Sequence, residues 1–528
     1  MSTVIDKAPA VAPPVRTGRH SAAAVLALAR FEARELLLQI PVFVFFLLYI
    51  GHALWKLFLP GDGMDDYPVL QSTDRGSQSV LPFLAVAVLM CVNVAALRSR
   101  RHGTDRHFDV LVMEPWRRTV AHALSVVPFA AVTALVVAVQ FGRAALKPGA
   151  AGHGSVAELA VGPLVVLLAG VLGVLIARLC PSIVGGPLFI VVGFAGLLVA
   201  SAVTGEKEHW LNWLYPVVSE NGADPIPSDL LGRPAAWHAL YLAGLTALLL
   251  CAAALVSGGR TRLLKALTVV ALGATAVGIA GQSPGHEAGL TAARTEVNRT
   301  PARFQSCVVY GRSTYCSFPE WTGWRDDWAR VADRVQRLAG GGAGGERLTV
   351  RQRIPLIYDL SSDAALTPLS TPGEVTVGTR WGGNRIPEFA VGVAAVLVAG
   401  DERTVSRMCD ARTVTVMWLA LAAQDDPAAA FRDVRLGDST SGSALALALT
   451  EPVSMSAEQT RIVRELLKQP RYSVTARVKA HWTELTSPKT SEARVAELLG
   501  VPGAAEGARN GAGKGADEGA GKGEWCQD

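Results

Sequence analysis

Long apolar segments alternate with short polar ones over the first half of the chain, and this pattern ends near Gln282. A helix needs about 20 mainly apolar residues to cross the hydrocarbon core of a bilayer. About seven segments meet this length, at residues 40–59, 79–97, 120–141, 158–178, 183–203, 237–256 and 263–281. The pattern therefore predicts a polytopic α-helical membrane protein of about seven spans, followed by an α-rich mixed α/β soluble domain.

Lys and Arg residues are distributed unevenly between alternate loops. With a cytoplasmic N-terminus, most of the basic residues near the spans fall inside, including Arg98, Arg100, Arg101, Arg106, Arg117 and Arg118. Loops rich in Lys and Arg stay on the cytoplasmic side of a membrane. We therefore expect a multi-pass cell-membrane protein with a cytoplasmic N-terminus, and an odd number of spans makes the C-terminal domain extracytoplasmic.

Two cysteines also indicate on which side of the membrane the C-terminal domain lies. Cys307 and Cys316 flank the segment VVYGRSTY, in which a glycine-containing turn lies between β-forming residues. This pattern predicts a hairpin. A disulfide between the two cysteines would fit an oxidising compartment, and the alternative is a pair of free thiols in a cytoplasmic domain.

Composition excludes several functions. Only 18% of the residues are charged, and the net charge of +5 is too small to indicate a nucleic-acid partner. The spans contain almost no ionisable side chain, which argues against an ion-coupled transporter or an intramembrane protease. Asn93 is expected to bond to a neighbouring helix. Close helix packing is expected at the glycines of spans four and five, which are Gly162, Gly170, Gly173, Gly185, Gly186, Gly193 and Gly196.

Two segments on the expected cytoplasmic side have more order than a simple loop. Residues 21–39 alternate apolar and charged positions at helical spacing, which predicts an amphipathic helix in the membrane plane. The alternative is an extension of the first span. In the loop 98–119, Gly103 follows a basic cluster and Pro115 ends a short apolar run. This order favours a short helix that binds a soluble partner over a plain topology signal.

These segments resemble type-2 ABC transporter permeases, in an actinobacterial form with an added C-terminal extracytoplasmic domain. The resemblance rests on R-x-x-x-R-E (Arg30 to Glu35), on Pro41 at the first span and on G-T-x-x-x-x-D-V-L-x-x-x-P (Gly103 to Pro115). It covers about residues 20–256. Arg106-His107 and Met113-Glu114 depart from the usual run of that family.

The resemblance implies a partner and its docking surface. A separate ABC ATPase would bind the cytoplasmic side, and the permease would pair with a second copy or with a related permease in the lipid bilayer. The implied docking residues are Arg30, Arg34, Glu35, Gly103, Thr104, Asp109, Leu111 and Pro115. ATP hydrolysis would occur in the partner, so the chain itself is not expected to be an enzyme.

The remainder of the chain divides by composition. Residues 1–20 are expected to be a disordered cytoplasmic tail, 282–300 a linker, 301–502 the extracytoplasmic domain and 503–528 a disordered tail. Helices are expected from Trp321 to Ala339 and at 387–400, 402–423, 456–468 and 472–499, with a strand at about 347–360. Trp321, Trp324 and Trp328 are interpreted as core residues.

Known catalytic and cofactor patterns fail in this chain. HEAGL at 286–290 lacks the second His of a zinc-protease helix, and the GAGKG repeats of the tail lack the Ser or Thr of a phosphate-binding loop. No cofactor or metal is predicted. Three functions stay open: an ABC permease subunit, a membrane-anchored sensor or scaffold with a permease-like core, and an ectoenzyme on a membrane anchor.

Overall fold

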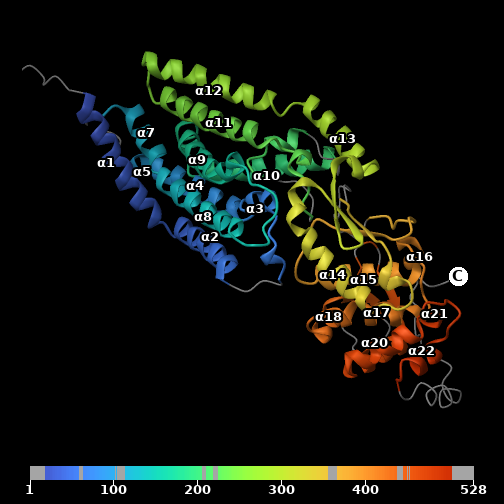
Figure 1. Cartoon of the computed structure of the whole chain (residues 1–528). Helices are drawn as coiled ribbons and strands as arrows, with labels where there is room; N and C mark the ends of the chain where they lie inside the picture. Colours follow the sequence, from blue (N-terminus) through green and yellow to red (C-terminus); the bar gives the residue numbers. More distant parts are fainter. Residues whose placement is uncertain are drawn as a thin grey trace, which may run out of the picture.

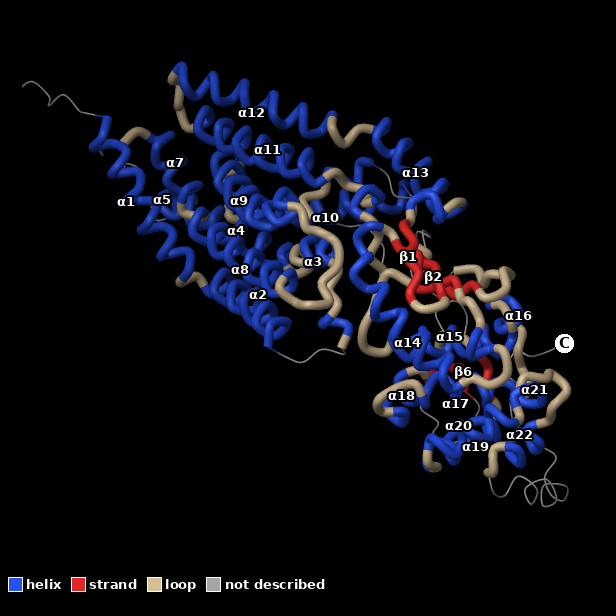
Figure 2. The backbone as a smooth tube through the Cα atoms, viewed as in Figure 1, coloured by secondary structure: helices blue, strands red, loops and turns tan. Residues whose placement is uncertain are grey.

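The computed structural model describes residues 18–58, 63–101, 103, 113–204, 210–217, 224–354, 366–436, 444–448, 450 and 452–501. Figure 1 shows a helical bundle built by the first half of the chain, with the C-terminal domain packed at one end of it. The strands lie in the C-terminal domain, as the red segments of Figure 2 show. The two regions therefore follow the change of composition near Gln282.

Apolar helices build the bundle. After the N-terminal helix α1 (Gly18–Leu37) they are α2 (Ile40–Phe58), α4 (Leu81–Ala96), α8 (Val127–Ala145), α9 (Val156–Leu179), α10 (Gly185–Thr204), α11 (Ala235–Val256) and α12 (Arg262–Ala280). The connecting segments form α3 (Leu70–Gly76), α5 (Arg98–Arg101), α7 (Pro115–Leu124) and the 3-10 turns η1 (Met64–Asp66), η2 (Trp210–Leu214) and η3 (Ser228–Leu230).

Six helical stretches of the described chain are long and apolar enough to cross a membrane. They are Ile40–Phe58, Leu70–Ala96, Pro115–Ala145, Val156–Leu179, Ala235–Val256 and Arg262–Arg299. The expected span at 183–203 corresponds to α10, within which Gly185–Gly196 is a shorter apolar stretch. The chain thus has the character of a helical membrane protein.

Helix α9 lies at the centre of the bundle, in contact with α4, α8 and α11. Gly173 permits its close approach to α4, because a Cβ atom there would lie 2.5 Å from the Leu89 carbonyl oxygen. The side-chain amide of Asn93 donates to the Gly173 carbonyl over 3.2 Å, which confirms the interhelical bond expected for Asn93. On α10, in contrast, Gly193 and Gly196 have no atom within 4 Å of a built Cβ, so they do not mediate close packing here.

Two small sheets organise the C-terminal domain. The first has the order β1 (Ser306–Tyr310), β2 (Ser313–Ser317), β3 (Thr349–Gln352) and β4 (Glu374–Val377). The pair β1 and β2 is the antiparallel hairpin expected around the cysteines, and β3 and β4 add in parallel. The second, antiparallel sheet contains β5 (Arg435–Leu436), β6 (Ala444–Ala446) and β7 (Val453–Met455).

Helices surround these sheets. They are α13 (Pro284–Arg299), α14 (Arg325–Leu338), α15 (Arg385–Ala399), α16 (Glu402–Ser406), α17 (Arg412–Ala422), α18 (Pro427–Asp433), α19 (Ala457–Lys468), α20 (Arg471–Ala480), α21 (Trp482–Leu485) and α22 (Glu492–Leu498), with 3-10 turns η4 (Pro301–Phe304), η5 (Pro319–Trp324) and η6 (Ala343–Gly345). Trp321 and Trp328 are fully buried in the domain core and Trp324 is 2% exposed, as interpreted from the sequence.

The structure departs from the expected elements in several places, and the helix expected at 472–499 is divided into α20, α21 and α22. The segment 282–300, expected as a linker, is mostly the helix α13, whose Leu290 and Val297 are buried. The expected helix at 402–423 is interrupted between α16 and α17. The sequence missed the short strands β4 to β7, because each has too few residues for an alternating pattern to be distinct. Of the expected strand at 347–360, the part from residue 355 onward lies outside the described residues.

Candidate functional site

The implied docking residues on α1 lie at the end of the bundle far from the C-terminal domain (Figure 1). Helix α1 packs on α7 through a face that buries Ala29, Glu32 and Leu36. Arg30 and Arg34 are exposed on the opposite face, and Glu35 is half-buried. The amphipathic character of α1 thus separates a bundle-facing side from a free basic side.

Glu32 and Glu35 on α1 lie near basic or polar side chains of the next helices. The guanidinium of Arg98 lies 3.7 Å from carboxylate oxygens of both Glu32 and Glu35, and His122 Nδ1 lies 3.9 Å from Glu32. Burial raises the pKa of Glu32, and the charge of Arg98 opposes that rise. Glu35 therefore contacts the next helices, whereas Arg30 and Arg34 lie on the exposed side of α1.

The expected docking loop is described at its two ends. Gly103 has a φ of 64°, a left-handed conformation that favours glycine. Pro115 is the first residue of α7, where its missing N–H costs nothing. The indole of Trp116 donates to Glu114 over 2.8 Å, and Arg117 pairs with Glu114 at 2.9 Å. Thr104, Asp109 and Leu111 lie outside the described residues.

The cysteine pair lies on the exposed edge of the first sheet. Cys307 on β1 is directly opposite Cys316 on β2, with Cα atoms 4.1 Å apart, and the two sulfurs form a disulfide. Cys409 is disulfide-bonded as well. Cys91, Cys180 and Cys251 are free.

Polar contacts and a shared core fasten the C-terminal domain to the bundle. The Trp324 indole donates to the Gly149 carbonyl over 2.8 Å, and a Glu320 carboxylate oxygen accepts from the Ser228 amide over 3.0 Å. Arg380 pairs with the buried Asp224 at 2.9 Å. Burial raises the pKa of Asp224, while the charges of Arg380 and Arg385 lower it. The domain is thus held in a defined position over this end of the bundle.

A buried ion pair lies beneath this junction. Glu158 at the start of α9 and Arg233 before α11 are 1% and 2% exposed, and their side chains pair directly. Gln78 donates to Glu158 over 2.6 Å and accepts from Arg233 over 3.3 Å. Sequence reasoning placed Glu158 at a span end and Arg233 in a loop but did not join them. The only signal was their opposite charge at the ends of neighbouring spans.

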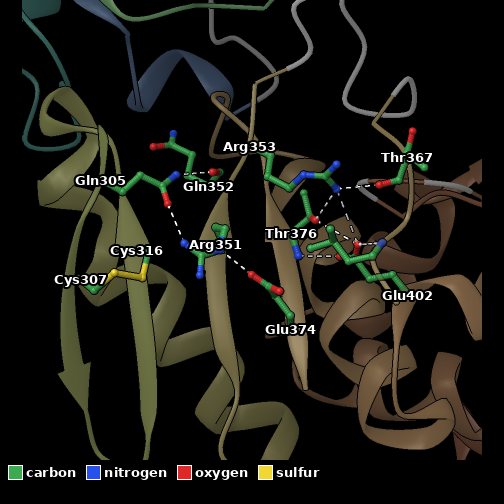
Figure 3. A network of polar contacts seen from close by, with 11 residues as sticks. Gln305, Cys307, Cys316, Arg351, Gln352, Arg353, Thr367, Glu374, Thr376 and Glu402 are labelled. Atoms are coloured by element: carbon green, nitrogen blue, oxygen red, sulfur yellow. Dashed lines mark hydrogen bonds and ion pairs between the residues drawn. A yellow bond between two sulfur atoms is a disulfide. The ribbon is translucent and has the colours of Figure 1, made fainter. Parts of the chain in front are cut away.

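Figure 3 shows a second polar network, which ties the edges of β3 and β4 to the neighbouring segments. Glu402 on α16 accepts from the Thr376 amide over 2.6 Å and from the Leu369 amide over 2.9 Å. Burial raises the pKa of Glu402, and these hydrogen bonds oppose the rise. Arg351 pairs with Glu374 on the adjacent strand. These contacts join β3, β4 and α16 to one another.

Within the described ranges, no three His, Cys, Asp or Glu side chains are grouped to hold a metal ion. A cavity of about 630 Å³ lies at the junction. It lies between the end of α2, the segment before α4, the end of α8 and Arg380–Trp381 of the C-terminal domain. The structure therefore offers two surfaces for function, one at each end of the bundle.

Comparisons of this chain with protein-family models, with curated proteins and with solved structures find no match.

Proposed function

We propose that the protein is the membrane-spanning permease subunit of an ABC transporter, driven by a separate ATP-binding subunit at the α1–α7 end. The observation that supports this proposal is a helix outside the spans, α1, which packs on α7 and places Glu32 near Arg98 of α5 and near His122 in the last turn of α7. Force applied to α1 or to the loop before Pro115 would therefore reach the spans directly.

Helix α7, on which α1 packs, also contacts the turn that follows α11. The hydroxyl of Thr119 on α7 lies 2.7 Å from that of Ser257, which follows α11. A Cβ atom at Gly259 would lie 3.2 Å from Trp116, so the turn after α11 also abuts α7. Movement of α7 would thus be transmitted to α11 as well as to α8, which continues from α7.

The basic face of α1 gives a direct test. We expect the double variant Arg30→Glu, Arg34→Glu to reduce recovery of the ATPase with the tagged protein at least about tenfold. Reversing charges at an interface costs several kcal/mol, and about 1.4 kcal/mol corresponds to a tenfold change. Recovery would be measured by mild-detergent pull-down from the native membrane, with the bound proteins quantified by mass spectrometry.

Arg262→Glu supplies the matched control, because Arg262 is an exposed arginine at the first turn of α12. This variant should retain the ATPase. Unchanged recovery with the α1 variant would contradict docking at this face. Absence of any ABC ATPase from the wild-type sample, under conditions in which a known ABC complex survives, would favour the alternative of a membrane-anchored sensor or scaffold.

We further propose seven spans, with α10 among them, an inside N-terminus and an extracytoplasmic C-terminal domain. The disulfide between Cys307 and Cys316 supports this orientation, because disulfides persist in oxidising compartments. The exposed Cys180 follows α9 at the opposite end of the bundle and serves as an internal reference.

In intact cells, a membrane-impermeant maleimide should label the exposed Cys307 only after treatment with an impermeant reductant, whereas its partner Cys316 is 1% exposed and should react little. Cys180 should become labelled only when the cells are permeabilised. Peptide mass spectrometry identifies each labelled cysteine. Labelling of Cys180 in intact cells, with Cys307 protected, would reverse the proposed orientation.

A further inference from the structure

The junction cavity of about 630 Å³ carries an excess of positive charge. Lys56 from α2 and Arg143 from α8 line it, together with His52, Lys147 and Arg380. Lys147 lies 3.8 Å from Asp66, and Arg380 is paired with Asp224. The acidic Asp65 also lines the cavity, and Arg143 lies over the Phe58 ring at 6.0 Å. Neither Lys56 nor Arg143 forms an ion pair with an acidic side chain among the described residues, so basic groups outnumber acidic ones in the described lining.

A second cavity adjoins the first and is mainly apolar. Both cavities are lined by Leu57, Arg143 and Lys147. The second continues along Phe58, Val139 and Leu146, which are 74%, 49% and 86% exposed. Phe58 ends one helix that is apolar enough to cross a membrane, while Val139 lies within a second and Leu146 directly follows it. The basic junction cavity therefore adjoins an apolar surface that would face the hydrocarbon core.

Two residues that line the junction cavity also have polar groups without a hydrogen-bond partner within the described chain. Tyr49 is 4% exposed and Trp381 is 2% exposed, and both side chains line the cavity. The Tyr49 hydroxyl and the Trp381 indole N–H are buried without a partner. Buried donors are nearly always satisfied. Tyr49 and Trp381 therefore contribute two donors beside the cavity that have no protein partner within the described chain.

From this arrangement we infer that the junction cavity binds an anionic membrane amphiphile. Its phosphate-type headgroup would lie between Lys56 and Arg143, and an acyl chain would follow Phe58, Val139 and Leu146. A free anion would use only the basic half, and an uncharged detergent only the apolar half. The volume lies within the usual range for small-molecule sites. The inference does not require an ATPase partner and stands apart from the proposed transport function.

The test uses the purified full-length protein in an uncharged maltoside detergent. Binding of dihexanoyl phosphatidylglycerol, an anionic short-chain lipid, is measured by native mass spectrometry and isothermal calorimetry. Dihexanoyl phosphatidylcholine and inorganic phosphate are titrated in parallel. We expect the anionic lipid to bind at least about tenfold more tightly than either, since a charge near lipid headgroups contributes about 1 kcal/mol and two cations act together here.

Lys56→Gln and Arg143→Gln should each weaken binding of the anionic lipid about fivefold. Lys265→Gln is the matched control, because Lys265 is an exposed lysine in the first turn of α12, at the far end of the bundle. It should bind as the wild type does. Equal weakening in Lys265→Gln would show general charge attraction and overturn the inference. Equal binding of phosphatidylcholine, or of inorganic phosphate, would overturn it too.

Discussion

Arg233→Ala is expected to lower the free energy of unfolding by about 3–5 kcal/mol, because it leaves the buried Glu158 carboxylate without its counter-charge. Both side chains are 2% exposed, so bulk water does not solvate the Glu158 carboxylate in the folded protein. Gln78 would remain as a donor to Glu158, but a neutral amide does not compensate a full charge. The bond from Arg75 to the backbone carbonyl at position 233, 2.9 Å long, does not involve the replaced side chain and should keep the start of α11 in place.

Reversible denaturation of the purified protein in mixed SDS micelles measures this change. Arg461→Ala is the control: its pair with Glu458 is 37% and 41% exposed and should contribute at most about 1 kcal/mol. A double replacement, Arg233→Met with Glu158→Leu, should recover most of the lost stability, because a well-packed apolar pair avoids the unpaired charge. A loss in Arg233→Ala no larger than in Arg461→Ala would show that the pair is not buried in the folded protein.

Gly173→Val should destabilise the bundle by at least about 1–3 kcal/mol, the usual cost of overpacking a well-packed core. A Cβ atom at Gly173 would lie 2.5 Å from the Leu89 carbonyl oxygen and 3.3 Å from the Asn93 amide nitrogen. Both atoms belong to the backbone of α4, so no side-chain rotation can relieve the clash. The helices must separate, which also breaks the bond from Asn93 to the Gly173 carbonyl.

Gly193→Val on α10 is the matched control, because a Cβ atom there meets nothing within 4 Å. The two variants add the same side chain to a glycine within an apolar helix, so helix propensity is similar and the neighbours differ. Of the two substitutions, only Gly173→Val should lower the melting temperature. Thermal denaturation in detergent, followed by circular dichroism, measures this change. Equal shifts in the two variants would contradict the close contact of α4 and α9.

The Arg30→Glu, Arg34→Glu variant should not change the stability of the bundle. Arg30 and Arg34 are exposed, so their substitution leaves the packing on α7 intact. An effect on ATPase recovery would therefore report docking rather than misfolding. Glu35 is unsuitable for the same test, because its contact with Arg98 helps to hold α1 in place.

Local pattern predicted the helices of the bundle and several elements of the C-terminal domain. Apolar runs near 20 residues mark membrane-spanning helices, since the bilayer fixes their length. The segment from Cys307 to Cys316 predicted the β1–β2 hairpin, because its turn and its β-forming residues are adjacent in the chain. The close approach at Gly173 and the bond of Asn93 also followed from residue type, since small and polar residues in apolar helices have few other uses.

Only the tertiary structure joined residues that are distant in the chain. Glu158 and Arg233 meet because α9 and α11 pack side by side, and a sequence read in one dimension contains no such distance. The junction cavity likewise combines Lys56, Arg143 and Arg380 from three separate parts of the chain. By itself the sequence determined an apolar bundle followed by a soluble domain. Packing decided which charges are buried as a pair and which remain free to bind a ligand.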